Sequence, residues 1–311
     1  MSGVELVKVK PADDGMRLNR WFLKYYPGLT MGRLQKLLRT KQIKVDGGRA
    51  EASVKLSSGQ EIRVPPLDNE KEVDEAKKDF VSRRDAEFII SLVIFKDKNI
   101  LVLNKPSGLA VQGGTNTARH VDGMLDALKF EQEERPRLVH RIDKDTSGLL
   151  VLARNRKYAE LLTKAFREHQ LQKTYLAFCR GVPEKEAGEI KNRLLKVGEK
   201  SILSPEGKDA VTTYQVIDTV GQKFSLIEAS PLTGRTHQIR AHLESIGCPI
   251  AGDDRYFGGE RQKSNMFADK LYLHAYKIDL SALYNKKFEL KAPLPDYFRQ
   301  SIKAAGINFK E

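Results

Sequence analysis

Two polar segments of the chain gather the residue types that could carry out chemistry. Residues 140–148 have the sequence His-Arg-Ile-Asp-Lys-Asp-Thr-Ser-Gly, and residues 233–243 have the sequence Thr-Gly-Arg-Thr-His-Gln-Ile-Arg-Ala-His-Leu. The carboxylates of the first segment could act as general acids, general bases or nucleophiles. The arginines of both segments could hold such a carboxylate ionised or bind an anionic substrate. Together they indicate a site built from an aspartate and cations.

Other chemistries fit the residues less well. Asp143 and Asp145 could form a glycosidase-type pair, but their spacing leaves their separation undetermined, and a chain with 8% aromatic residues and one tryptophan is poor in sugar-stacking side chains. His237 and His242 are five residues apart, whereas a helical zinc motif needs four. The two cysteines show no metal or nucleophile spacing, and no phosphate-binding Gly-x4-Gly-Lys-Ser/Thr loop is present. The remaining candidate for the catalytic group is a single carboxylate with arginine neighbours.

Strand-like apolar runs are expected to hold the first segment in place. Residues 99–103 (Asn-Ile-Leu-Val-Leu) precede it, and residues 149–153 (Leu-Leu-Val-Leu-Ala) follow it directly. A helix is expected over residues 158–167 and a strand over residues 173–178. Loops between strands are where rigid scaffolds present catalytic groups, so we expect residues 140–148 to form such a loop.

A helix is expected to carry the second segment. Ile239, Leu243 and Ile246 are spaced i, i+4 and i+7, which places them on one apolar face. Two threonines that precede this face are available as helix caps. Arg240 would then lie beside the apolar face, where it can reach a carboxylate that is partly shielded from water.

Composition limits the class of protein. The chain has 311 residues, enough for two domains, of which 40% are hydrophobic and 31% charged. No apolar run approaches the roughly 20 residues that span a membrane, and the first residues lack the apolar segment of a secretory signal. Two cysteines cannot form a disulfide framework, so we expect a cytoplasmic protein. The net charge of +13 favours a polyanionic partner such as a nucleic acid.

The charge is unevenly distributed along the chain. Residues 1–66 contain 13 Lys and Arg against 6 Asp and Glu, whereas residues 67–91 contain 5 against 8. The second stretch follows two prolines and is mostly polar until Phe88, as is typical of a linker. We therefore expect an RNA-binding domain over residues 1–66, a charged connection over residues 67–87 and a catalytic domain over residues 88–311.

The N-terminal part has the periodicity of two helices followed by a β-hairpin. The apolar spacing from Leu18 predicts the first helix, and residues 30–41 predict the second. The hairpin is expected between residues 43–45 and 59–64. The polar face of the second helix carries the cations Arg33, Lys36 and Arg39. Such a cationic face suits grip on a folded RNA backbone, and a merely solvated helix face is the alternative.

Residues 15–66 resemble the S4 RNA-binding domain. That family has Ser-Arg at the start of its second helix and Val-Asn-Gly in its hairpin. The corresponding segments here are residues 30–33 (Thr-Met-Gly-Arg) and residues 45–47 (Val-Asp-Gly). The resemblance implies a small αα-β fold that binds RNA.

The second domain resembles the RluA-type pseudouridine synthases. Residues 140–148 are similar to the family signature, with isoleucine at position 142 where leucine is usual. Three further motifs follow in the family's order: Lys-Thr-Tyr at residues 173–175, Gly-Arg-Thr-His-Gln-Ile-Arg at residues 234–240 and Leu-His-Ala at residues 273–275. Within the family the chain is most similar to the large-subunit rRNA pseudouridine synthase C subgroup. The segments that carry this further resemblance are residues 62–66, 103–108, 113–114 and 253–256.

The resemblance to the synthases implies roles for individual residues. It makes Asp143 the catalytic carboxylate, Arg240 the arginine that pairs with it, and Tyr175 the tyrosine that stacks on the base and takes the C5 proton. Arg141 would enter the space that the flipped uridine leaves, and Leu273 would line the uracil pocket. Two further residues are expected to contact RNA phosphates, namely Lys105 and Arg235. Three histidines are expected to serve as structural hydrogen-bonding groups, namely His140, His237 and His274. The family needs no metal and no organic cofactor.

We therefore expect an α+β protein with an S4-like domain and a catalytic domain on a mixed, largely antiparallel sheet with a central cleft. The expected reaction converts uridine to pseudouridine in RNA, with 23S rRNA as the favoured substrate. The chain is expected to act as a monomer without an obligatory protein partner. The same chemistry on tRNA or at other rRNA positions is one alternative, and a non-catalytic assembly factor that binds rRNA is another. A DNA-binding protein is disfavoured because no helix-turn-helix or zinc-finger pattern is present.

Overall fold

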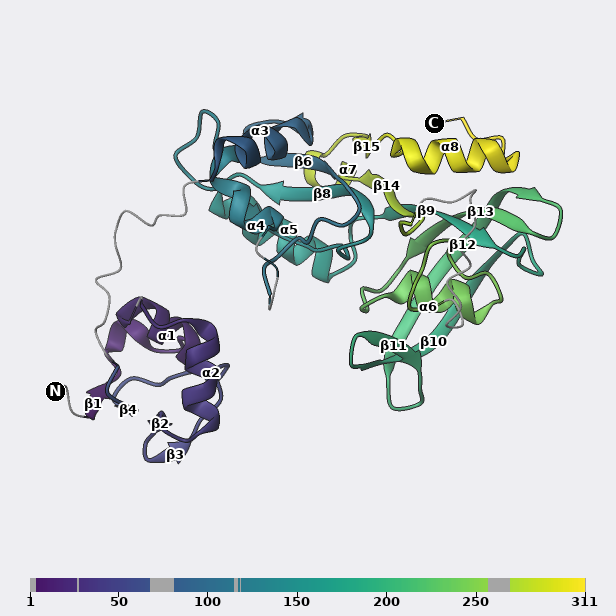
Figure 1. Ribbon diagram of the computed structural model, residues 1–311. Helices are drawn as coiled ribbons and strands as arrows, with labels where there is room; N and C mark the ends of the chain where they lie inside the picture. Colours follow the sequence, from purple (N-terminus) through teal and green to yellow (C-terminus); the bar gives the residue numbers. More distant parts are fainter. Residues whose placement is uncertain are drawn as a thin grey trace. The chain divides into compact units, whose positions relative to one another are not determined.

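The chain divides into two compact units, Met1–Phe80 and Val81–Glu311 (Figure 1). The computed structural model describes residues 4–26, 28–67, 81–114, 117, 119–256 and 269–310. The division falls inside the expected connection, most of which lies outside the described residues. Helix α3 spans Arg83–Ser91 and is capped by Ser82, so regular structure in the second unit begins before residue 88. In the part of the chain that is described, no helix is both long and apolar enough to cross a membrane.

In its described residues the first unit contains two α-helices, one short 3-10 helix (Pro11–Asp13) and a four-stranded sheet of order β1-β4-β2-β3. As the sequence predicts, two helices precede a β-hairpin, and the Thr30 hydroxyl accepts a hydrogen bond of 3.3 Å from the Arg33 amide to cap the second helix. The additional strand β1 pairs antiparallel with β4. The elements are β1 (Glu5–Lys8), α1 (Leu18–Tyr25), α2 (Met31–Arg39), β2 (Lys44–Val45), β3 (Gly48–Arg49) and β4 (Glu61–Val64).

The core of the first unit forms between the helices and the sheet. Leu18, Trp21 and Phe22 project from one face of α1 and are almost completely buried, together with Leu34 and Leu38 of α2. Burial of these large apolar side chains stabilises the unit and fixes which face of α2 is turned outward. The cations of α2 at positions 33, 36 and 39 are exposed on that outer face.

An 11-stranded sheet forms the second unit, in the order β11-β10-β12-β13-β9-β14-β8-β6-β5 with β15 and β7 attached to β14 and β8. Among the described strands only β8 and β14 pair in parallel, so the prediction of a mixed, largely antiparallel sheet is confirmed. The apolar runs before and after residues 140–148 form neighbouring antiparallel strands, β6 and β8. The strands are β5 (Val93–Lys96), β6 (Ile100–Lys105), β7 (Arg137–Leu138), β8 (Ser147–Ala153), β9 (Lys173–Arg180), β10 (Ala187–Val197), β11 (Lys200–Leu203), β12 (Lys208–Val220), β13 (Phe224–Pro231), β14 (Leu273–Asp279) and β15 (Glu289–Lys291).

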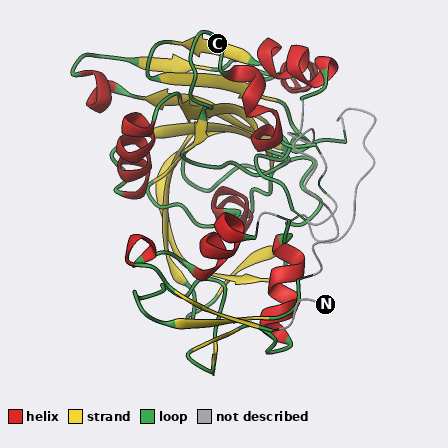
Figure 2. Cartoon of the chain, turned by 90° about the vertical axis from the view of Figure 1, so that its left-hand side faces the viewer, coloured by secondary structure: helices red, strands yellow, loops and turns green. Residues whose placement is uncertain are grey.

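Helices flank this sheet, drawn red against the yellow strands in Figure 2. Their apolar faces contribute to two separate cores: α3 and α5 pack on the half that contains β6 and β8, whereas α6 and α8 pack on the half that contains β9 and β13. The helices are α3, α4 (Val121–Met124), α5 (Arg156–Arg167), α6 (Gln238–Ser245), α7 (Ser281–Tyr284) and α8 (Asp296–Ala305).

The two halves of the sheet meet where β8 and β14 run side by side. Their parallel pairing involves only two residue pairs, His274 with Ser147 and Ala275 with Gly148. Gly148 has a φ of +103°, and a Cβ at this position would lie 2.2 Å from the carbonyl oxygen of Ala275. Only glycine fits this backbone conformation and this close approach. Next to it, the Ser147 hydroxyl and His274 Nδ1 lie 2.9 Å apart in the buried interior.

Candidate active site

A pocket of about 180 Å³ lies beside the junction of the two sheet halves. The loop before β8, strands β9 and β14, and helix α6 with the segment that precedes it form its walls. Six of the site residues that the sequence predicts line this pocket, namely Arg141, Asp143, Tyr175, Arg235, Arg240 and Leu273. The fold therefore brings together residues that are up to 132 positions apart in the sequence.

The sheet register explains why these side chains converge. Tyr175 on β9 lies opposite Ala275 on β14, two residues beyond Leu273. Strand β8 pairs with the same part of β14, and the loop that contains Asp143 leads directly into β8. The Thr146 amide donates a hydrogen bond of 3.2 Å to the Asp143 carbonyl and closes this loop as a turn.

Asp143 and Tyr175 are both partly buried at the pocket. The Asp143 side chain is 26% exposed, and its Oδ2 lies 3.8 Å from His237 Nε2. Burial and the negative charge of Asp143 raise the pKa of Tyr175 far above its usual value. The phenol therefore keeps its proton at neutral pH, while the partly exposed carboxylate faces the pocket.

Arg240 has a different direct partner from the one expected. Its Nε and Nη2 donate hydrogen bonds of 2.7 and 2.6 Å to the two carboxylate oxygens of Asp253, and both side chains are almost fully buried. Among the described residues the direct carboxylate partner of Arg240 is Asp253 and not Asp143, and both carboxylates favour a raised pKa of Arg240, Asp253 more than Asp143. The sequence prediction of a shielded, bidentate carboxylate partner is confirmed, but that carboxylate is Asp253.

Lys105 does not fit the expected role of a phosphate contact. Its side chain is fully buried, and Nζ donates hydrogen bonds of 2.9 Å to the carbonyls of Pro106, Leu109 and Lys144. Three acceptors occupy all three ammonium protons, which leaves none for RNA. The bond to Lys144 instead ties β6 to the loop that carries Asp143.

Two predicted cations differ in their attachment to the pocket. Arg141 is exposed at its edge. Arg235 donates a 3.0 Å hydrogen bond from Nε to the Asp209 carbonyl, which aligns its guanidinium along the wall. The cations of α2 belong to the other compact unit.

Comparison with known proteins decides the family. Residues 99–245 match the family described as RNA pseudouridylate synthase. The chain is 37% identical to ribosomal large subunit pseudouridine synthase C of Rickettsia bellii, over 91% of this chain and 96% of that protein. It is 33% identical to the protein of the same name from Vibrio cholerae, over 96% of each. The chain belongs to the RluA-type pseudouridine synthases.

As an RluA-type synthase, the chain is an RNA-modifying isomerase. Among solved structures it is similar to human RNA pseudouridylate synthase domain containing 4, with 28% identity and a TM-score of 0.63 over 73% of this chain and 97% of that one. A second human structure, RNA pseudouridylate synthase domain containing 1, shares the fold at 22% identity and a TM-score of 0.54 over 70% of this chain and 94% of that one.

The start of helix α6 and the residues beside it differ from what the sequence of this RluA-type synthase predicts. The threonine caps expected for α6 are absent: the N-cap is His237, in the left-handed conformation with a φ of +51°, without a side-chain capping bond. The Thr233 hydroxyl instead donates to the side chain of Gln238. Asp253 and Tyr256 were available in the sequence only as a subgroup motif. Their proximity to α6 depends on the conformation of the loop after that helix, which no local pattern encodes.

Two other histidines of this RluA-type synthase have structural partners, as predicted. His140 Nε2 accepts a 2.8 Å hydrogen bond from the Val151 amide, and its ring stacks on Phe166. His274 bonds to the Ser147 hydroxyl and lies 3.2 Å from the carbonyl oxygen of Ala292. Burial lowers the pKa of His140 to about 3 and that of His274 to about 4, so both rings are neutral.

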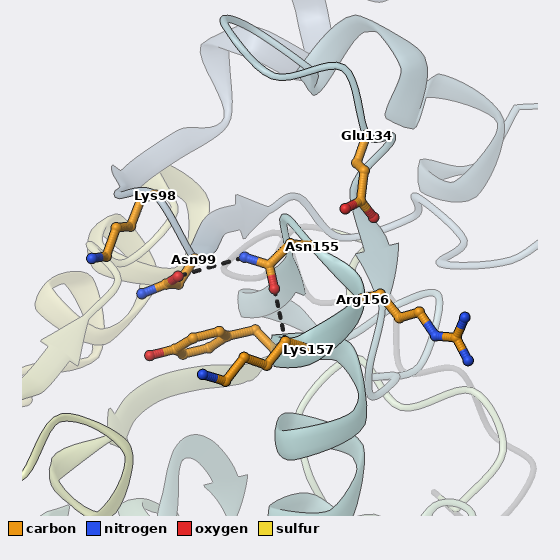
Figure 3. A pocket seen from close by; sticks show the side chains of 7 residues that line it. Lys98, Asn99, Glu134, Asn155, Arg156 and Lys157 are labelled. Atoms are coloured by element: carbon orange, nitrogen blue, oxygen red, sulfur yellow. Dashed lines mark hydrogen bonds between the residues drawn. The ribbon is translucent and has the colours of Figure 1, made fainter.

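A second hollow, of about 390 Å³, lies at the N-terminus of α5 (Figure 3). Its charged side chains are Lys98, Glu134, Arg156 and Lys157. Asn155 accepts a hydrogen bond from the Tyr158 amide to cap α5, and its amide group also reaches Asn99. None of these residues lines the Asp143 pocket, so this hollow is separate from the synthase site.

Proposed function

We propose that this chain converts uridine to pseudouridine in the RNA of the large ribosomal subunit, with Asp143 as the catalytic carboxylate. The observation that carries the assignment is the convergence of Asp143, Tyr175 and Leu273 on one pocket walled by Arg240. The substrate follows from the names of the relatives from Rickettsia bellii and Vibrio cholerae. We further propose a cytoplasmic monomer, with 23S rRNA as the substrate.

The reaction breaks the bond between N1 of uracil and C1′ of ribose and forms a bond between C5 and C1′. Asp143 acts either as a nucleophile at C1′ or as a base at C2′, and an ionised carboxylate serves both routes. The uracil ring then turns within the pocket, bonds through C5 and loses the C5 proton. The atomic composition of the nucleotide is unchanged, because C5 loses one proton to solvent and N1 gains one from it.

Tyr175 and Leu273 serve as the surfaces that hold the uracil ring. A phenol whose pKa is raised above its usual range is protonated and cannot accept the C5 proton at neutral pH. We therefore keep for Tyr175 the stacking role, and the C5 proton passes to solvent water. Leu273 lies opposite Ala177 in the β14–β9 ladder and gives the pocket an apolar wall.

Arg141 and Arg235 are proposed to hold the RNA around the target nucleotide. Flipping a base out of its stack costs a few kcal/mol. The exposed guanidinium of Arg141 offsets part of this cost by stacking and hydrogen bonding in the vacated space. Arg235, on the pocket wall, is placed to contact a phosphate.

Release of tritium from 5-tritiated uridine in unmodified 23S rRNA tests the proposal directly. We expect release by the wild-type protein and a loss of about 10⁴-fold or more in Asp143→Asn, since a covalent or proton-transfer role cannot be met by an amide. Asp296→Asn is the matched control, because Asp296 is an exposed carboxylate at the start of α8.

Each other outcome identifies a different alternative. Turnover on tRNA instead of rRNA would move the same chemistry to another substrate. Tight rRNA binding with no release on any RNA would indicate a non-catalytic binding protein. Equal rates for the wild type and Asp143→Asn would remove Asp143 from the reaction.

A further inference from the structure

We propose that His237 is a positioning residue for Asp143, with Nε2–H directed at the carboxylate and Nδ1 held by the hydroxyl of Tyr256. The inference rests on the proposed function, because it takes Asp143 as the reacting carboxylate. It adds to that function a hydrogen-bonded support that runs from the pocket to the edge of the sheet.

The backbone places the His237 ring between two polar partners. On one side Nε2 lies 3.8 Å from Asp143 Oδ2, and on the other Nδ1 lies 3.3 Å from Tyr256 Oη. The side chain is only 10% exposed, so water competes little for either nitrogen. Catalytic hydrogen bonds are often long without substrate and tighten in the complex. A shift of about 1 Å or less would bring Nε2 within hydrogen-bond distance of the carboxylate.

The carboxylate determines which ring nitrogen carries the proton. Burial lowers the pKa of His237, against the opposing effect of Asp143, so the ring is neutral at pH 7 and has one proton to place. A proton on Nε2 points a positive N–H dipole at Asp143, whereas a proton on Nδ1 would point a lone pair at a negative charge. With Nε2 protonated, Nδ1 is left as an acceptor 3.3 Å from the Tyr256 hydroxyl, whose single hydrogen it shares with the carbonyl oxygen of Ser201 at 3.1 Å.

Tyr256 is itself held at both ends. The Ser201 amide donates a 2.7 Å hydrogen bond to Tyr256 Oη, and the Ser201 hydroxyl donates 2.6 Å to the Thr236 carbonyl, next to His237. The Tyr256 amide donates to Asp253, the partner of Arg240. Tyr256, which contacts His237, is therefore hydrogen-bonded to Ser201 of strand β11.

Charged groups around the ring come from several elements. Asp143 faces His237 from the loop before β8, and Arg240 faces it from α6. Asp253 and Arg255 act on it from the turn that contains Tyr256. The two acidic and two basic groups act on the ring in opposite directions. The contacts that orient the ring are therefore the one with Tyr256 and the approach to Asp143.

His237→Asn tests the positioning role in steady-state assays on rRNA. Asparagine accepts the left-handed backbone conformation of position 237 but cannot reach Asp143 as the imidazole does. We expect kcat to fall by about 10- to 100-fold, as for other residues that orient a reacting group, with KM changed by less than about twofold.

Tyr256→Phe tests the second contact without touching the pocket's charged groups. The phenyl ring keeps its place beside the Arg240 guanidinium, whose carbon lies 5.1 Å from the ring centre. We expect kcat to fall by about tenfold because the tautomer of His237 is no longer fixed. Tyr214→Phe is the matched control, since its hydroxyl donates to the Lys185 carbonyl away from the pocket, and its kcat should equal the wild-type value.

Rescue by free imidazole separates positioning from a merely structural role. Glycine at position 237 suits a φ of +51° and leaves a space of the size of the ring. We expect imidazole to raise kcat of His237→Gly about fivefold or more, and ammonium chloride at equal ionic strength to have no effect. A structural defect would not respond to a small molecule in this way.

The outcomes distinguish this inference from the proposed function. Wild-type kcat in His237→Asn, or a rise in KM alone, would overturn the positioning role while leaving the synthase assignment intact, provided that Asp143→Asn is inactive. Absence of imidazole rescue together with a lowered melting temperature would assign His237 to folding only. If the wild type makes no pseudouridine, the proposed function and this inference fail together.

Discussion

The basic residues of helix α2 in the first unit and two buried basic residues of the second unit, Arg240 and Lys105, differ in their surroundings. Arg33, Lys36 and Arg39 are exposed on one face of α2. Arg240 and Lys105 are 2% and 0% exposed, and each is bound to a carboxylate or to carbonyls of the protein itself. Exposed cations attract phosphates and are screened by salt, whereas buried cations fix geometry. Burial therefore separates basic residues that are free to meet a polyanion from basic residues that hold the protein's own scaffold.

Removing one member of the buried pair gives the largest expected effect. Arg240→Met leaves the carboxylate of Asp253 buried without its partner, which should lower the free energy of unfolding by about 3–5 kcal/mol. Turnover should be lost as well, because the pocket wall rearranges. Denaturant unfolding followed by circular dichroism measures the stability, since the single tryptophan, Trp21, reports only on the first unit.

The double variant Arg240→Met, Asp253→Asn is the control for this change. Asparagine keeps an acceptor for the amides of Arg255 and Tyr256 but carries no charge. We expect most of the stability to return and the activity to stay low. An Arg240→Met protein as stable as the wild type would contradict the distinction between buried and exposed cations.

Lys105 should make the free energy of unfolding rise with pH above neutral pH. Burial lowers its pKa to about 7, against the charges of Asp145 and Asp143. The unfolded chain keeps this proton up to about pH 10.4, so between pH 7 and that value the unfolded state binds more protons. The free energy of unfolding should therefore rise with pH by at most about 1.4 kcal/mol per pH unit relative to Lys105→Met. Parallel pH profiles of the two proteins would show that Lys105 does not titrate in this range.

Removing the first unit tests whether its exposed basic residues contribute to RNA binding. A fragment of residues 81–311 should keep its far-ultraviolet circular dichroism and melting temperature, because the second unit has its own cores. Its affinity for rRNA should fall by about tenfold or more, with a shallower dependence on salt. Binding assays from about 50 to 300 mM salt measure both quantities. An unchanged salt slope would exclude the first unit from RNA binding.

The smallest effect is expected from neutralising α2 alone. Replacing Arg33, Lys36 and Arg39 by glutamine should lower the salt slope by about 0.7–0.9 for each phosphate that the helix no longer neutralises, without a change in stability. A matched variant replaces the three cations of the second hollow, Lys98, Arg156 and Lys157 (Figure 3). Equal reductions in both variants would mean that net charge, and not the α2 face, governs binding.

Much of the scaffold could be predicted because it follows local rules. The apolar runs form β6 and β8, the apolar face of α1 forms part of the core of the first unit, and Thr30 caps α2. These elements depend on neighbours a few residues away, which periodicity and capping preferences describe well. The position of β14 between β8 and β9 could not be derived in this way, since it joins segments more than 90 residues apart.

The site shows the same limit at the level of single residues. Motifs alone were enough to expect Asp143 and Tyr175 in one pocket, but the sequence could not choose the carboxylate partner of Arg240 among several aspartates. Lys105 sits between an apolar strand and a proline turn, and its burial depends on three carbonyls that fold around it. For His237 the sequence predicts only a structural role, since its distance to Asp143 depends on a left-handed residue at the start of α6.

The contact between β8 and β14 has an evolutionary consequence. A mutation that adds even one methyl group at Gly148 would force the carbonyl of Ala275 away and separate the strands on which the pocket is built. Natural variation should therefore be excluded at this codon. A lineage could then acquire new RNA targets by altering peripheral loops and inherit the catalytic centre unchanged.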